Sequence, residues 1–387
     1  MFRCEEILRN PRWILEVFGC WPVRKPTKTY TIKMLAASAF TLAFPAMLCV
    51  EILFAYKNYN TLMQILNFLI PYVYVLCKYT IFTFQQNKLF ALLNWTNSKI
   101  FNQSFVDGDK ILRSAYDVVV MVTKVFRFTL ALALSMIALL PLSETKLYPV
   151  PISHDLGSYS ILMYVFQITC LGIGGWLCIG YDCGFIAFTA IGIAQIDILK
   201  LRLSSVIQDL GLNQDAFSNS SNVEQLKMQT KIKETLKACI IQHLAIQEYC
   251  KRLNNLFSTT IFIQYLMSIL ALAITMSRIL TITELSVKIL ELAFILMFIF
   301  TQLITYSWSG NQIMIKSSDI GEACYMGQWY YYDVSNRKIL FFIMERAKRL
   351  LYIKASMFAK TTLATCINIL RCTYSIFTIL RMTYHEN

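Results

Sequence analysis

The sequence predicts an all-α, seven-transmembrane helical membrane protein with a cytoplasmic N-terminus and an extracellular C-terminus. Three observations support this fold class. Hydrophobic residues make up 56% of the 387 residues, and charged residues make up only 15%, against about 25% in ordinary soluble domains. The hydrophobic residues gather in seven long segments. The basic residues gather on one side of those segments.

Each of the seven apolar segments is long enough to span a bilayer as a helix, since a hydrocarbon core of about 30 Å needs roughly 20 residues. The segments cover residues 34–56, 61–84, 116–140, 158–193, 257–280, 288–308 and 355–382. No fixed-period repeat connects them, which argues against a solenoid and weakens the case for a transporter built from inverted repeats.

The distribution of Lys and Arg sets the predicted orientation. Of the 36 basic residues, 26 fall in residues 1–33, 85–115, 200–252 and 310–354, whereas six fall on the opposite side. Cytoplasmic loops of membrane proteins are enriched in Lys and Arg, so residues 1–33 are predicted to form a cytoplasmic N-terminal segment. The net charge of +13 would also suit a nucleic-acid-binding protein. Charges that flank apolar spans favour the membrane protein instead, with lipid as a partner and no nucleic acid.

Several helices are predicted to continue below the membrane into a cytoplasmic anchor bundle. A helix over 158–205 would be about 70 Å long, so its second half projects into the cytoplasm. Amphipathic patterns over 223–256 and 335–353 predict two further helices there. The predicted divisions are the N-terminal segment, six transmembrane helices within 34–309 with a long loop at 200–256, an anchor region at 310–354, and a seventh helix with an extracellular tail at 355–387.

The sequence contains no catalytic motif. A nucleophile elbow, a phosphate-binding loop and paired catalytic carboxylates are all missing, so no enzymatic activity and no cofactor are expected. The twelve Cys residues do not form the pattern of a disulfide framework, and the histidines lack the spacing of metal ligands. Three glycosylation sequons lie on the predicted cytoplasmic side, where no glycan is expected. They begin at Asn94, Asn102 and Asn219.

The most specific motifs lie in the last third of the chain. They are Ser317, Ala323, Tyr325, Trp329-Tyr330, Arg337-Lys338 and the run Thr373-Tyr374-Ser375-Ile376-Phe377-Thr378-Ile379-Leu380-Arg381. Together with Phe18-Gly19-Cys20-Trp21-Pro22 near the start, this pattern resembles the insect odorant receptor family. The length, the number of segments and the orientation agree with that family over the whole chain. The co-receptor's long insertion between the fourth and fifth crossings is missing, so the chain resembles a tuning subunit.

The resemblance implies a ligand-gated, non-selective cation channel in the plasma membrane of a sensory neuron. Members of the family are tetramers in which the seventh helices line one central pore. A tuning subunit of this kind assembles with a shared co-receptor and binds a volatile odorant. Two alternatives remain open from the sequence. A related gustatory receptor would assemble without the olfactory co-receptor, and a G-protein-coupled receptor would carry its N-terminus outside the cell.

The resemblance also implies positions for the pore. It places the narrow gate near Phe377, the outer mouth near Leu380 and Arg381, and Thr373 below the gate. An apolar constriction of this kind can gate a channel by dewetting. Packing alone is the alternative role for Phe377.

A second pattern marks another face of the last segment. Asn368, Arg371, Ser375 and Thr378 follow one another at spacings of three, four and three residues. Such a polar stripe is costly against lipid and should face water or another helix. Because neighbouring positions on a helix differ by about 100°, this stripe and the gate residues cannot share one narrow face. We assign the gate to the residues implied by the resemblance, and the stripe to interhelical contacts or the flank of the pore.

Aromatic residues and Met in the outer halves of several segments predict an apolar odorant pocket. A small volatile ligand suits such a pocket, and Met adds an adaptable surface. Packing and interfacial belts are the alternative roles for these side chains. The candidate ligand contacts, with Tyr72, Tyr164 and Phe298 as first choices, are Phe68, Tyr72, Tyr74, Met136, Tyr164, Phe166, Phe294 and Phe298.

Two further groups have predicted structural roles. Charges near the inner membrane edge usually pair or extend toward water, so Asp182 is expected to pair with Lys78, Lys124 or Arg127 rather than bind an ion. A second group of aromatic residues is expected to pack in the anchor or at a subunit interface. These residues are Tyr325, Trp329, Tyr330 and Tyr374.

Overall fold

The computed structural model describes residues 2–103, 105, 107–143, 148–152, 157–210, 221–282, 287–356 and 359–386. Seven helices of this part are long and apolar enough to cross a membrane. Apart from two strands of two residues each, the regular structure of the described residues is helical. This confirms the predicted all-α, seven-span fold class. The seven helices are α2 (Lys28–Ala55), α3 (Tyr59–Phe84), α5 (Gly108–Ser143), α6 (Ser160–Ser204), α9 (Asn222–Thr281), α10 (Val287–Ser318) and α13 (Leu363–Glu386).

Shorter elements connect and extend these helices. They are η1 (Cys4–Leu8), α1 (Arg9–Val17), α4 (Gln86–Thr96), η2 (Gly157–Tyr159), α7 (Val206–Asp209), α11 (Ile320–Met326), η3 (Trp329–Tyr331), α12 (Val334–Ala347), β1 (Lys354–Ala355) and β2 (Ala359–Lys360). Side-chain caps fix several helix starts, because they satisfy backbone N–H groups that have no partner in the first turn. The Asn58 side chain accepts from the Thr61 amide at the start of α3, and Ser221 and Glu224 form a capping box at the start of α9.

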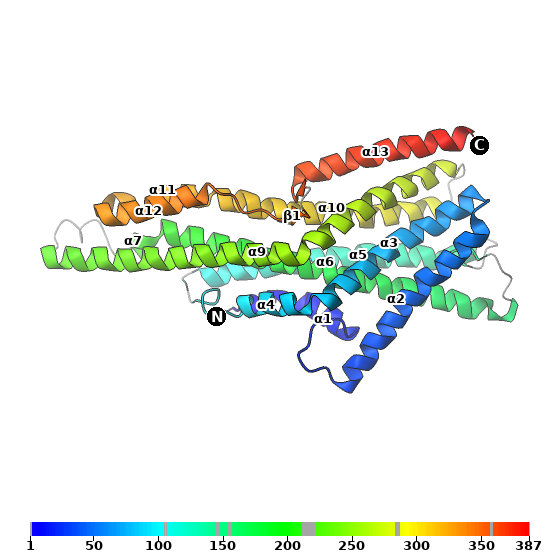
Figure 1. Cartoon of the computed structure of the whole chain (residues 1–387), viewed down its shortest axis with the longest axis horizontal. Coiled ribbons are helices and arrows are strands. Elements are labelled where there is room, and N and C mark those ends of the chain that lie inside the picture. The colour runs from blue at the N-terminus through cyan, green and yellow to red at the C-terminus, as the bar shows by residue number, and fades with distance from the viewer. Residues whose placement is uncertain are drawn as a thin grey trace.

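Helices α6 and α9 extend well beyond the membrane thickness. The 45 residues of α6 and the 60 residues of α9 exceed the roughly 20 residues that one crossing needs. The amphipathic stretch at 223–256 and the fifth apolar segment are one continuous helix. Figure 1 shows α7, α11 and α12 gathered at one end of the molecule beside the first half of α9. These helices correspond to the bundle that the sequence predicts on the cytoplasmic side.

The N-terminal segment is part of the core and contains two short helices that the hydropathy pattern did not predict. Helix α1 and η1 pack against α6. Cys4, Ile7 and Ile14 are at most 1% exposed. The Cys4 amide donates to the Asn102 side chain at 3.1 Å, and that side chain donates to the Thr96 carbonyl at 2.7 Å. The asparagine of the sequon that begins at Asn102 therefore has a structural role, because its side chain joins Cys4 to Thr96. Asn219 lies outside the described residues.

The prediction that the seventh span begins at residue 355 is wrong. Residues 354–360 include an antiparallel pair of strands that joins Lys354 to Lys360 and Ala355 to Ala359. The Ser356 amide donates to the Ser258 carbonyl of α9 at 3.1 Å. A hydrogen bond to a neighbouring helix therefore takes the place of the hydrogen bond that this amide would make within a helix. Helix α13 therefore begins only at Leu363.

Candidate ligand site and pore helix

An aromatic cluster between α2, α3 and α6 surrounds Tyr72. The Tyr72 hydroxyl donates to the Cys170 carbonyl at 2.8 Å, and the ring lies 4.7 Å from that of Phe44. Phe68 belongs to the same buried cluster, and Phe166 packs against it. These contacts bring three of the eight predicted ligand residues together.

Gly174, which belongs to no motif in the sequence, shapes this cluster. A Cβ atom at Gly174 would lie 2.7 Å from the Tyr72 ring carbon Cε2. The tyrosine ring therefore lies directly against the α6 backbone. Glycine inside a helix often marks such a close approach, but one sequence does not reveal which ring makes it.

The other five predicted ligand residues are distributed over different surroundings. Tyr164 donates to the Ala138 carbonyl at 2.9 Å, and Phe298 lies 6.3 Å from Phe126 between α5 and α10. Tyr74 belongs to the main core and faces Lys78. Met136 and Phe294 are half-buried.

A fully buried charge pair joins α3 to α6. The predicted pairing of Asp182 is confirmed, and its partner is Lys78; both side chains are 0% exposed. Asp182 also accepts from the Tyr306 hydroxyl at 2.6 Å and from Gln302 Nε2 at 2.8 Å. The Lys78 ammonium lies 3.7 Å from the centroid of the Tyr74 ring. Since Tyr306 and Gln302 belong to α10, this network links three membrane helices.

The other two candidates for that pairing have different surroundings. Arg127 lies 5.6 Å from the Trp13 ring and 5.5 Å from the Trp176 ring, distances typical of cation–π contacts. Lys124 is exposed.

Helix α13 is the least covered of the seven candidate spans in the described part of the chain. Only 17% of its apolar window is buried, and it contacts α9 and α10. Figure 1 shows it along one edge of the molecule. Cys366, Ile369 and Thr373 form its buried face. Most of the helix surface is therefore available to another molecule.

The exposed surface of α13 carries the polar stripe predicted from the sequence. Asn368, Arg371 and Ser375 are exposed, and Thr378 is half-buried. Of the predicted pore residues, Arg381 is exposed and Phe377 and Leu380 are half-buried, whereas Thr373 is only 2% exposed. Thr373 thus faces helices of its own chain.

Three of the four predicted anchor aromatics, Tyr325 on α11 and Trp329 and Tyr330 on η3, form an aromatic patch beside α12. Tyr325 is 63% exposed and lies 6.4 Å from the Trp329 ring. The patch surrounds a hollow of about 620 Å³ that Phe341 and Phe342 also line. Tyr330 is 54% exposed beside it, while Tyr374 lies on α13 and is 64% exposed.

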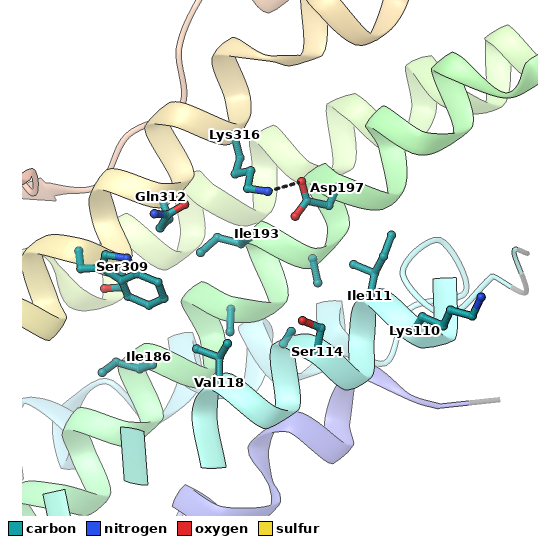
Figure 2. Close-up of a pocket in the computed structure, with 14 residues that line it drawn as sticks. Lys110, Ile111, Ser114, Val118, Ile186, Ile193, Asp197, Ser309, Gln312 and Lys316 are labelled. Atoms are coloured by element: carbon teal, nitrogen blue, oxygen red, sulfur yellow. Dashed lines mark ion pairs between the residues drawn. The ribbon is translucent and has the colours of Figure 1, made fainter. Parts of the chain in front are cut away.

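A cavity of about 390 Å³ lies between α5, α6 and α10. Figure 2 shows Val118 and Ile186 at one end and the Lys316–Asp197 ion pair at the other. We call this cavity, together with the adjoining hollow that shares three of its residues, the inner crevice. The cavity is lined by Lys110, Ile111, Ser114, Ala115, Val118, Ile186, Ala190, Ile193, Ala194, Asp197, Trp308, Ser309, Gln312 and Lys316.

Metal-ligating side chains do not cluster in the described part of the chain. No group of three or more His, Cys, Asp or Glu side chains there is arranged to hold a metal ion. All twelve cysteines are free. His154 lies outside the described residues.

These features define a multi-pass membrane protein with a peripheral polar helix and an extended helical bundle. The family described as 7tm odorant receptor matches residues 58–374. The chain belongs to this family of insect odorant receptors. That membership agrees with the absence of a catalytic motif from the sequence.

Individual relatives are similar over part of their length. Odorant receptor 10 of Aedes albopictus is 25% identical over 224 residues, which cover 58% of this chain and 56% of the relative. Odorant receptor Or2 of Anopheles gambiae is 29% identical over 153 residues, which cover 39% of each chain. The matched part of the chain therefore spans about half or less of the length of these two curated relatives.

The fold has a match among solved structures. The insect olfactory receptor OR5 from Machilis hrabei, in complex with eugenol, superposes with a TM-score of 0.82. The match covers 98% of both chains at 14% sequence identity. At this identity the likeness concerns the fold alone.

Proposed function

We propose that this chain is the tuning subunit of an odorant-gated, non-selective cation channel that assembles with a co-receptor. The observation that carries the proposal is the exposed polar face of α13. Polar and charged side chains in a membrane helix face a water-filled path or a neighbouring helix, because contact with lipid is costly. Asn368, Arg371 and Ser375 are exposed and have neither among the described residues of the single chain. Subunits that meet along α13 would provide both.

The gate in this proposal is formed by Phe377, with Leu380 and Arg381 at the outer mouth. Asn368, Arg371 and Ser375 flank the pore or contact the neighbouring subunit. Thr373 is left out of the pore, because it is buried against its own chain. The aromatic patch on α11 and η3, with the adjoining Phe341 and Phe342 of α12, supports an assembly at the cytoplasmic end, since contiguous apolar surfaces mark interaction sites.

The odorant site in this proposal is the region around Tyr72, between α3 and α6. Its aromatic side chains and few polar groups suit a small volatile molecule. The structure of the relative OR5 contains eugenol, a ligand of that relative. A ligand opens the channel only if it binds the open state more tightly than the closed one. The charge network of Asp182 connects this region to α10, which contacts α13.

The test is expression of this chain with and without the co-receptor, followed by whole-cell recording against a panel of volatiles. The proposal predicts an odorant-evoked cation current that needs both subunits. A current from this chain alone would indicate a gustatory-type channel. An epitope at residue 1 that antibodies reach on intact cells would contradict the cytoplasmic N-terminus.

A further inference from the structure

We propose that the inner crevice binds a membrane phospholipid whose headgroup carries both a phosphate and an ammonium group. The crevice lies at the level of the inner membrane edge. Its residue Trp308 follows Val287 at the outer start of α10 by roughly the 20 residues that one crossing needs. Tryptophan is also enriched at that level of the bilayer.

The cavity is amphipathic along its length. Val118, Ile186 and Ile193 supply apolar walls, and Lys316 and Asp197 close the opposite end (Figure 2). Its volume of about 390 Å³ is within the range of about 300–1,000 Å³ for small-molecule pockets. An apolar chain at one end and a charged group at the other therefore match the two ends of an amphiphile.

Exposed apolar side chains continue from the cavity into the membrane. On α5, Met121, Val125 and Phe128 follow Val118 on one helix face and are 61%, 41% and 64% exposed. Residues three, four and seven apart share a face of a helix. In the proposed orientation α5 runs outward from the cytoplasm, so this stripe leads from the cavity toward the centre of the bilayer.

Helix α10 runs in the opposite direction and supplies the other side of the path. Ile304 and Met297 precede Trp308 on one face and are 51% and 37% exposed. A hydrocarbon chain between the α5 and α10 stripes would reach the cavity along mainly apolar side chains, and the exposed Lys124 lies beside this path on α5. This continuity favours a membrane lipid over a soluble phosphate compound.

The charges of the crevice include both signs. Lys316 pairs with Asp197 at 3.1 Å, and Lys200 pairs with Asp319 at 3.0 Å. A purely anionic headgroup would be attracted by the lysines but repelled by these carboxylates. A headgroup with a phosphate and an ammonium has a partner for each charge. The charged residues of the crevice are Asp107, Lys110, Asp197, Lys200, Lys316, Asp319 and Glu322.

The experiment is native mass spectrometry of the purified full chain after incubation with three probes. These are dioleoyl phosphatidylethanolamine, dioleoyl phosphatidylglycerol and free phosphoethanolamine. The proposal predicts that phosphatidylethanolamine is retained in preference to the other two. Ala115→Phe, which fills the cavity, and Lys316→Ala, which removes a charged hydrogen-bond donor, should each weaken retention by about tenfold or more. Two controls, Ala115→Ser and Lys233→Ala, should retain the lipid like the unmodified chain, because Lys233 is exposed on α9 outside the crevice.

Thermal unfolding of each variant identifies any that fails to fold. Equal retention of phosphatidylglycerol and phosphatidylethanolamine would overturn the proposal, because it would indicate non-selective annular lipid. Retention by folded Ala115→Phe at the level of the unmodified chain would overturn it too. Binding of free phosphoethanolamine as tight as that of the lipid would show that the apolar path has no role.

Discussion

Replacing Asp182 with Asn tests whether the buried charge network holds the membrane helices together. The substitution keeps the shape of the side chain and removes its charge. Lys78 is 0% exposed, so its ammonium would remain buried without an anion. Asp182 also accepts hydrogen bonds from Tyr306 and Gln302, and an Asn side chain has a single acceptor oxygen to serve them.

The expected cost follows from the burial of both partners. Removing one member of a buried ion pair destabilises a protein by about 3–5 kcal/mol, because the other charge is left unpaired. Removing both charges together is often neutral when apolar side chains fill the space. Asp182→Asn should therefore lower stability by about 3 kcal/mol or more, and Lys78→Met with Asp182→Leu by about 1 kcal/mol or less.

The assay heats the purified full chain in detergent and follows the fraction that stays monodisperse. The single variant should lose its fold at a clearly lower temperature than the unmodified chain, and the double variant should recover most of the difference. Equal melting of the single variant and the unmodified chain would refute the reasoning. A double variant as unstable as the single one would show that the polar network, and not the unpaired lysine, sets the cost.

Four further predictions concern three separate parts of the chain. Burial raises the pKa of the Cys4 thiol to about 12, so maleimide at pH 8 should label Cys4 only after unfolding, and labelling of the native chain would contradict its position. Tyr72→Phe removes one hydrogen bond, worth about 1 kcal/mol, and should raise the half-maximal odorant concentration by less than about tenfold. Gly174→Leu should abolish the odorant response at normal surface expression, because even a Cβ atom there would lie 2.7 Å from the Tyr72 ring; an unchanged dose–response curve would exclude an odorant site at this cluster. Phe342→Ser should reduce co-assembly with the co-receptor on native gels without changing the melting of the chain alone, and unchanged co-assembly would remove the patch from the interface.

The sequence was sufficient for the features that depend on length and composition. Seven apolar segments predict seven spans, because the bilayer fixes how many residues one crossing needs. The length of the fourth segment predicts the long helix α6, which ends at Ser204. The isolated acid Asp182 predicts a cationic partner, since an unpaired buried charge is costly.

Features that depend on tertiary contacts could not be predicted from one sequence. Three basic residues were equally suitable partners for Asp182, and only packing identifies Lys78. The helices of the N-terminal segment are amphipathic and short. They contain no long apolar run, so the hydropathy pattern does not reveal that they are buried against α6. The strands Lys354–Ala355 and Ala359–Lys360 form because their backbones pair with each other. The neighbouring Ser356 amide forms a hydrogen bond to α9. An apolar composition alone predicted that this stretch belonged to the last helix.

The surroundings of the candidate ligand residues illustrate the same limit. Tyr72 and Tyr74 are two positions apart on α3, so they point to different sides of the helix. Tyr72 joins the aromatic cluster with Phe44, whereas Tyr74 faces the buried Lys78. The density of aromatic residues indicated both as ligand contacts, and the hydropathy pattern contains nothing that separates them.

Cysteine modification of α13 during current recording tests the central claim most directly. In a background with Cys372→Ser, single cysteines replace Phe377, Arg381 or the buried Thr373, and a charged thiosulfonate reagent is applied from outside. The account predicts that modification blocks the odorant-evoked current at 377 and 381 and leaves it unchanged at 373. Currents that no modified position on α13 alters would show that this helix does not line the ion path.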